Sequence, residues 1–166
     1  MRERKVTNFM LFEEAFDKLS RWCAYQERSQ QDARLKLRKL RVEEDVAEAV
    51  IARLIEENYL NEERFAMAFA GGKFRIKRWG KQKIKLELRK HGVSDYCIKK
   101  ALASLGDDDY DAELKKLVEK KVASSKYTDR RKLYYSVMNF AVSKGYESEK
   151  VSKELNKLIE EQQYES

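Results

Sequence analysis

Apolar side chains recur along most of this chain every three or four residues, which is the spacing of an amphipathic helix. The pattern is clearest from Glu43 to Tyr59, from Asn61 to Phe74, and from Ser148 onward. Acidic residues fill the first turn of the first segment, where negative charge suits the helix dipole. Asn61 is placed to cap the second segment, because its side chain can accept a hydrogen bond from a free backbone N–H group. The pattern predicts an all-α protein.

The helical pattern also repeats itself. Placing Gly92 on Gly145 aligns the apolar positions on both sides of each glycine, and placing Val42 on Val93 extends the match toward the N-terminus. The matched positions are Ala33 with Ile84 and Val137, Leu37 with Leu88 and Ala141, Leu35 with Leu86, Ile98 with Val151, Leu102 with Leu155, and Leu105 with Leu158. A unit of about 50 residues is too small to bury much apolar surface alone, so neighbouring units should stack.

We therefore predict an elongated, curved tandem array of three three-helix repeats. The predicted boundaries are an N-terminal arm at 1–11, repeats at 12–60, 61–108 and 109–161, and a tail at 162–166. The absence of proline agrees with helices joined by short links, since proline interrupts helices and is common in turns. Charged residues make up 39% of the chain, which indicates the large solvated surface of an elongated helical protein.

One part of the pattern competes with the helical interpretation. Ile84, Leu86 and Leu88 alternate with charged residues, as Leu35 and Leu37 do, and this period of two is typical of a β-strand. We favour a helix, because the residues are Lys, Leu, Glu and Arg, the segment is long for a strand, and no hairpin turn follows. A middle helix packed against its own repeat on one side and against the next repeat on the other would show this pattern.

The residues that could carry catalysis or hold a metal form no complete set. His91 is the single histidine, and Cys23 and Cys97 stand far apart, so a zinc site would lack its usual ligands. Both cysteines are interpreted as buried, reduced thiols, with a disulfide as the alternative. Gly80-Lys81 lacks the other residues of a phosphate-binding loop, and the acidic run at 107–109 suits the start of a helix better than a metal site. We predict neither an enzyme nor a metal centre.

Positive charge is concentrated in one region. The formal net charge is +7, and between Lys73 and His91 nine basic residues stand against Glu87 alone. We define the basic stripe as these nine residues and five from the equivalent helix of the first repeat: Lys73, Arg75, Lys77, Arg78, Lys81, Lys83, Lys85, Arg89, Lys90, Arg34, Lys36, Arg38, Lys39 and Arg41. On stacked repeats, this set could face a phosphate backbone or an acidic protein groove, or simply solvate the helices. Trp79 could stack on a base, or could lie in the core at a helix end.

The second repeat contains three motifs with distinctive spacing. They are Tyr59-Leu60-Asn61-Glu62-Glu63-Arg64-Phe65-Ala66, Trp79-Gly80-Lys81-Gln82-Lys83-Ile84 and Leu88-Arg89-Lys90-His91-Gly92-Val93. Together they resemble the central signature of the RecX family, and the similarity runs from about Ala15 to Leu105. Gly71-Gly72 is a departure from the family pattern, and we expect it to bend or shorten the first helix of the repeat.

The resemblance implies a fold of tandem three-helix repeats and a regulatory protein without enzyme activity or cofactor. RecX proteins bind within the groove of the RecA–DNA filament and inhibit ATP hydrolysis, strand exchange and RecA-assisted repressor cleavage, which links them to DNA repair, recombination and the SOS response. Some members also bind single- or double-stranded DNA. We expect a cytoplasmic monomer without membrane association, because no apolar run approaches the roughly 20 residues of a membrane span and no signal-peptide core follows the N-terminus.

Two other functions fit the sequence. A three-helix unit with a basic second helix also resembles helix-turn-helix modules, which predicts a stand-alone DNA-binding protein whose affinity falls steeply with salt. A general helical scaffold for a different protein partner predicts neither DNA binding nor an effect on a recombinase.

If the basic stripe faces DNA or an acidic groove, reversing the charge of Lys81, Lys83 and Lys85 together should weaken binding to the RecA–DNA filament. The measurement is the protein concentration that half-saturates preformed filaments. Unchanged binding would rule out this placement of the stripe.

Overall fold

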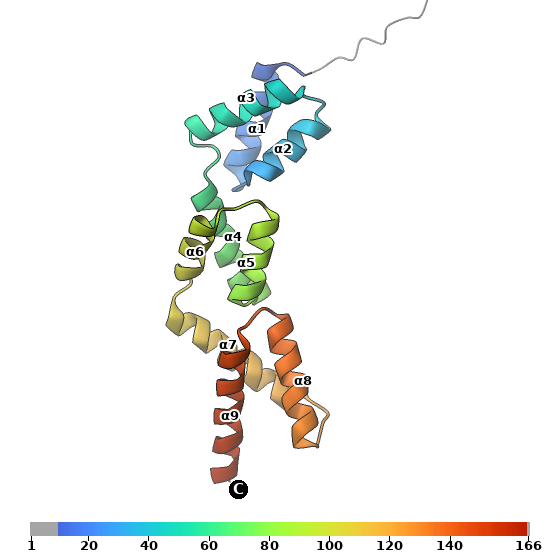
Figure 1. Ribbon diagram of the computed structural model, residues 1–166, viewed down its shortest axis with the longest axis vertical. Coiled ribbons are helices and arrows are strands. Elements are labelled where there is room, and N and C mark those ends of the chain that lie inside the picture. Colours follow the sequence, from blue (N-terminus) through green and yellow to red (C-terminus); the bar gives the residue numbers. More distant parts are fainter. Residues whose placement is uncertain (1–9, 166) are drawn as a thin grey trace, which may run out of the picture.

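The computed structural model describes residues 10–165, and within this range the chain is entirely helical apart from short links (Figure 1). Most of the predicted N-terminal arm, residues 1–9, and the last tail residue, 166, lie outside the described range. The all-α class predicted from the apolar spacing is confirmed.

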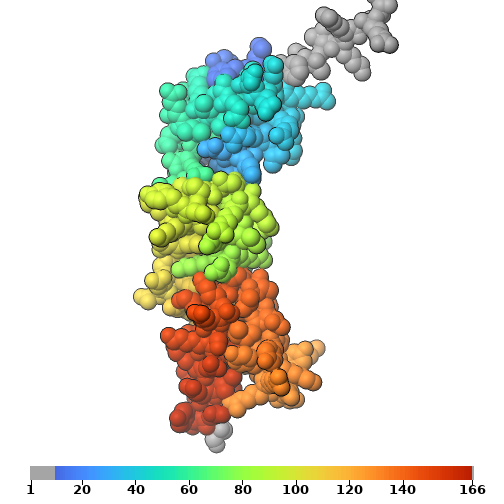
Figure 2. All heavy atoms as spheres, in the orientation of Figure 1, coloured from blue at the N-terminus to red at the C-terminus, as the bar shows by residue number. Residues whose placement is uncertain are grey.

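The helices of the described chain follow one another in three groups of three, which we call repeats 1, 2 and 3. Repeat 1 contains α1 (Phe12–Tyr25), α2 (Gln30–Lys39) and α3 (Glu44–Glu56); repeat 2 contains α4 (Glu62–Lys77), α5 (Lys81–Lys90) and α6 (Asp95–Ala103); repeat 3 contains α7 (Asp107–Ser124), α8 (Arg130–Ser143) and α9 (Ser148–Tyr164). The repeats succeed one another along the long axis of an elongated molecule, as Figure 2 shows. Figure 1 places the middle helices α2, α5 and α8 along the same side of this array.

Side-chain caps begin several helices where the sequence places Ser, Asn or Asp. The Asn61 side chain accepts a hydrogen bond from the N–H of Arg64 at 2.9 Å, which confirms the predicted cap of α4. Ser29 and Asp32 form a reciprocal capping box at the start of α2. The acidic residues at 107–109 form the first turn of α7, so this helix begins ahead of the predicted repeat boundary at 109.

The middle helices α2 and α5 are helical, as predicted, but the reason given for their alternating pattern is wrong. Ile84 and Leu88 are fully buried, whereas Leu86, between them, is 54% exposed. Leu37 is likewise buried and Leu35 is 50% exposed. Positions i and i+4 share one face of a helix and position i+2 lies on the other. The second face of each middle helix is therefore not covered by the next repeat.

Gly71-Gly72 does not shorten α4, which continues through both glycines to Lys77. Gly71 is buried, and the guanidinium of Arg75, one turn later, lies where a side chain at position 71 would begin. Gly72 has open space around its Cα. The helix therefore tolerates the pair without a break, at the cost in helix propensity that glycine carries.

The buried apolar residues form two separate cores. One belongs to repeat 1 and is built around Leu19, Val50 and Leu54. The other is continuous through repeats 2 and 3, from Phe65 in α4 to Leu155 in α9. Each core contains one cysteine, and both cysteines are buried and free, as predicted. Repeats 2 and 3 thus share a core that repeat 1 does not.

Repeats 2 and 3 meet through their backbones at two glycines. The N–H of Gly80 donates to the carbonyl of Lys144 at 2.8 Å, and the N–H of Gln82 donates to the carbonyl of Gly145 at 2.9 Å. A Cβ atom added to Gly145 would lie 2.4 Å from Cβ of Lys83, and one added to Gly80 would lie 2.3 Å from the carbonyl carbon of Gly145. Gly145 also has a φ of +102°, a conformation that side chains rarely permit.

Aromatic side chains fill the space beside this glycine contact. The ring of Tyr110 lies between those of Phe74 and Tyr146, with centroid distances of 5.9 and 5.2 Å. Its hydroxyl accepts a hydrogen bond from the N–H of Lys81 at 3.0 Å and donates one to the Glu147 carboxylate at 2.6 Å. Tyr110, in α7, therefore connects the start of α5 in repeat 2 to the residue that precedes α9 in repeat 3, while its ring remains in the core.

Repeats 1 and 2 meet through side chains. The guanidinium of Arg64 donates to the carboxylate of Glu27 and, at 2.9 Å, to the carbonyl of Asn58. His91 packs against two phenylalanine rings of α4, and its Nδ1 lies 3.6 Å from Oδ1 of Asp32. The ion-pairing side chains of this contact are only partly buried, so it is more polar and more open than the contact between repeats 2 and 3.

Gly145→Ala should lower the free energy of unfolding by about 2–4 kcal/mol, because the new Cβ would overlap Lys83 and the backbone would be strained. Gly72→Ala is the matched control. It places a Cβ in open space inside a helix and should raise the free energy of unfolding by up to about 1 kcal/mol. Urea unfolding followed by circular dichroism measures both, and equal effects of the two substitutions would contradict the glycine contact.

Alkaline pH should weaken the shared core of repeats 2 and 3. Burial raises the pKa of Tyr146 to about 12, and burial also raises the pKa of Tyr110. Because tyrosines of the unfolded chain ionise near pH 10, the contribution of these two side chains to the free energy of unfolding should be constant below about pH 10. That contribution should be lost as the pH rises toward 12. Tyr146→Phe should make the resulting fall in the free energy of unfolding shallower. Urea unfolding at a series of pH values measures the free energy of unfolding of the unmodified protein and of the variant. The same pH dependence in the two would refute the assignment of the fall to Tyr146.

Candidate functional site

The structure places the basic stripe on α2, on the end of α4 and along α5, with Arg41 and Arg78 in the links that follow α2 and α4. Because α2 and α5 lie on the same side of the array, these segments are brought to one side of the molecule (Figure 1). They are not equally available to a ligand, since many of the cations have partners within the protein.

Five members of the basic stripe form ion pairs with acidic residues. The pairs are Arg34 with Glu48, Arg78 with Glu113, Lys81 with Asp107, Arg89 with Asp95, and Lys90 with Glu87. Hydrogen bonding to Arg34 lowers the pKa of the Glu48 carboxyl, so this partner stays ionised. Such exposed pairs stabilise the fold little, but each one reduces the positive potential of the stripe at its position.

Four lysines of the stripe lie over aromatic rings. The ammonium groups of Lys73 and Lys83 are 4.9 and 4.5 Å from the ring centroid of Trp79. Trp79 is half-buried and packs against the core of repeats 2 and 3, so its surroundings fit a packing role better than base stacking. Lys81 lies over Tyr110, and Lys36 lies over Trp22.

The remaining stripe residues have no ion pair or ring contact within the described chain, and they are Arg38, Lys39, Arg41, Arg75, Lys77 and Lys85. Most are exposed, and they fall at the end of α2 and at the end of α4. The available positive charge is therefore gathered in two patches, with Lys85 apart from them in α5, rather than spread evenly.

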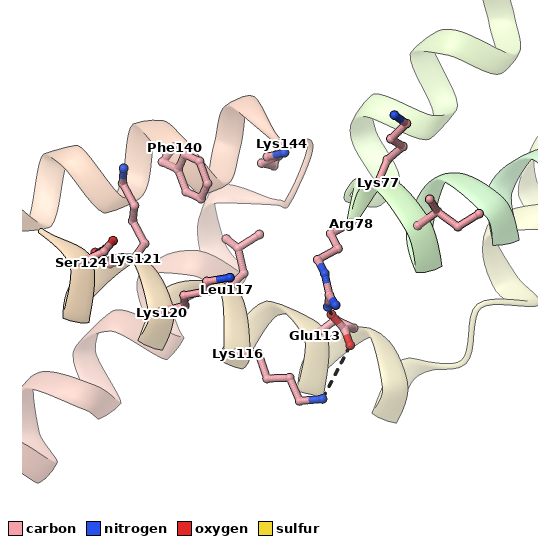
Figure 3. Close-up of a pocket in the computed structure, with 11 residues that line it drawn as sticks. Lys77, Arg78, Glu113, Lys116, Leu117, Lys120, Lys121, Ser124, Phe140 and Lys144 are labelled. Atoms are coloured by element: carbon pink, nitrogen blue, oxygen red, sulfur yellow. Dashed lines mark hydrogen bonds and ion pairs between the residues drawn. The ribbon is translucent and has the colours of Figure 1, made fainter.

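A groove between repeats 2 and 3 brings two residues of the basic stripe together with further lysines that lie outside it (Figure 3). It has a volume of about 500 Å³, and its walls come from the end of α4, from α7 and from the end of α8. We call it the junction groove. Its cationic residues are Lys77, Arg78, Lys116, Lys120, Lys121 and Lys144, and Glu113 is its one acidic residue. Ile76, Leu117 and Phe140 contribute apolar surface.

The lysines of α7 are inconspicuous in the sequence because acidic residues stand among them. The six acidic residues of α7, which include Glu113 and Glu119, outnumber its four lysines. In the structure Glu119 lies on a different surface, beside α9, while Lys116 and Lys120 line the junction groove. Their i, i+4 spacing, which puts two side chains on one helix face, is the signal that could have found them.

Membrane spans and metal sites are both absent from the described residues. No helix there combines the length and the apolar character needed to cross a membrane. No three His, Cys, Asp or Glu side chains in that part of the chain come together in a way that could hold a metal ion.

Comparison with known proteins places the chain among bacterial regulatory proteins. The family model for the second three-helix domain of RecX matches residues 61–102. The Regulatory protein RecX of Clostridium perfringens (strain SM101 / Type A) is 33% identical over 121 residues, which cover 72% of this chain and 56% of that protein. The protein of the same name from Clostridium tetani is 35% identical over 114 residues, which cover 68% of this chain and 52% of that protein. The chain thus spans about half the length of these curated relatives.

Solved structures show the same fold. The crystal structure of RecX from Lactobacillus salivarius superimposes with a TM-score of 0.79 at 22% identity, covering 89% of this chain and 96% of that one. A second crystal structure, of a regulatory protein RecX, gives a TM-score of 0.78 at 20% identity. At this level of identity, the likeness establishes the fold of tandem helical repeats.

Proposed function

The chain belongs to the RecX family, and we propose that it binds the RecA–DNA filament and inhibits the recombinase's ATP hydrolysis and strand exchange. Its relatives are named regulatory proteins, and the motifs of the second repeat resemble the family signature associated with this activity. The observation that carries the proposal is the elongated array with α2, α5 and α8 along one side (Figure 1). A surface of this form suits a partner that is itself long and repetitive.

The two patches of available cations provide the first contacts in this proposal. Arg38, Lys39 and Arg41 lie at the end of α2, and Arg75 and Lys77 lie at the end of α4. Each exposed cation contributes little alone, but patches on successive repeats of one molecule engage a repetitive partner with a high effective concentration. Contacts of this kind with DNA phosphates or acidic protein surface would bridge neighbouring recombinase subunits. Bridged subunits would be held in one state or released from the filament.

The decisive experiment titrates the protein into DNA-dependent ATP hydrolysis by the cognate RecA. Inhibition at well below one copy per recombinase supports binding across several subunits. Lack of inhibition, together with recombinase-independent DNA binding that falls steeply with salt, would favour the stand-alone DNA-binding protein instead.

Arg38→Glu combined with Arg41→Glu should raise the concentration needed for half-inhibition by about tenfold, because both cations lack a partner within the protein. Lys99→Glu combined with Lys153→Glu is the matched control. It changes the net charge equally at exposed positions of α6 and α9, and should shift half-inhibition by no more than about twofold. Equal shifts in the two double variants would mean that total charge, and not the α2 patch, determines binding.

A further inference from the structure

The junction groove holds much more positive charge than its own acidic residue can balance. Glu113 is already shared between Arg78 and Lys116, the latter with an N–O distance of 3.8 Å. Lys77, Lys120 and Lys144 have no ion pair within the described chain. Like charges held close together lower stability, so folding alone does not explain why they converge on one concave surface. The excess positive charge of the groove favours the binding of an anionic ligand.

The groove also offers apolar surface that a simple anion would not use. Ile76, at the end of α4, is 78% exposed, and Leu117 and Phe140 are half-buried beside it. Figure 3 shows Leu117 and Phe140 between Lys121 of α7 and Lys144, the residue that follows α8. Large apolar side chains left in contact with water gain free energy when another apolar group covers them. The ligand should therefore carry both negative charge and an apolar group.

A polypeptide fits these two requirements better than a nucleic acid strand does. A base would need an open ring face, but the ammonium groups of Lys121 and Lys144 lie 4.6 and 5.9 Å from the Phe140 centroid. The one guanidinium in the groove, that of Arg78, is paired with Glu113 and is therefore not free to form bidentate hydrogen bonds with a phosphate. A phosphate backbone would also leave the aliphatic surface of the groove unused.

We propose that the junction groove binds an acidic peptide segment that carries a large apolar side chain. The apolar side chain covers Ile76, Leu117 and the edge of the Phe140 ring, and carboxylates on either side of it reach the lysines of α7 and Lys144. Lys116 and Lys120 are one helical turn apart, a rise of about 6 Å, which is close to the roughly 6.6 Å between alternate residues of an extended peptide. An extended segment with alternating carboxylates can therefore meet both lysines at once.

This site extends the proposed function, since such a segment would belong to a protein partner. The site can nevertheless be tested without any recombinase. If the peptide does not bind, only the assignment of the groove is refuted. If the protein does not inhibit ATP hydrolysis by the recombinase, only the proposed function is refuted.

The test measures fluorescence anisotropy of a labelled synthetic peptide of alternating glutamate and serine with one central phenylalanine, titrated with the full chain. Lys116→Glu combined with Lys120→Glu should weaken binding by at least about tenfold, because two attractive contacts become repulsive. The control pair Lys99→Glu and Lys153→Glu, with the same change in net charge, should alter binding by less than about twofold. Replacing the phenylalanine of the peptide with serine should also weaken binding to the unmodified protein.

Two results would overturn the proposal. Equal binding of the peptide by the groove variant and the control variant would show that the groove is not the site. Tighter binding of an oligo-dT strand of the same charge, lost on Lys116→Glu with Lys120→Glu, would assign the groove to nucleic acid. All of these lysines are on the surface, and circular dichroism verifies that each variant is folded.

Discussion

Gly80 and Gly145 approach so closely that neither can carry a side chain, and the arrangement of repeats 2 and 3 depends on this contact. The two backbone hydrogen bonds beside it fix the start of α5 against the link between α8 and α9. With that distance fixed, the ring of Tyr110 fits between Phe74 and Tyr146, and one core runs through both repeats. The same contact sets the end of α4 across from α7 and α8, and so creates the junction groove.

The sequence was sufficient to predict the helices and their grouping, because those features depend on local spacing and on repeated glycine and apolar positions. It could not predict which face of α2 and α5 is covered, since Leu35 and Leu37 look alike in sequence and differ only in what packs against them. The basic stripe shows a similar limit. The acidic partners of Arg34 and Arg78 come from α3 and α7, and only folding brings these helices together. The junction groove depends on three helices at once, which no local pattern reveals.

The two contacts between repeats differ in kind, and this difference divides the molecule into unequal parts. Repeat 1 has its own core and touches repeat 2 through Arg64, Glu27, His91 and other partly buried side chains. Repeats 2 and 3 share backbone hydrogen bonds and a continuous core. Side-chain contacts can adjust by rotamer changes, whereas a glycine backbone contact has no such freedom. Any bending of the array should therefore concentrate between repeats 1 and 2.

The glycine contact also has a consequence for how such chains can evolve. A contact made by side chains can change during evolution, because a substitution in one side chain can be compensated by a substitution in its neighbour. Gly80 and Gly145 cannot be substituted in this compensated way, since any side chain at one position would overlap the backbone or a Cβ atom of the other repeat. Repeats 2 and 3 should therefore be inherited as a single block, and duplication or loss of modules should occur more readily at repeat 1.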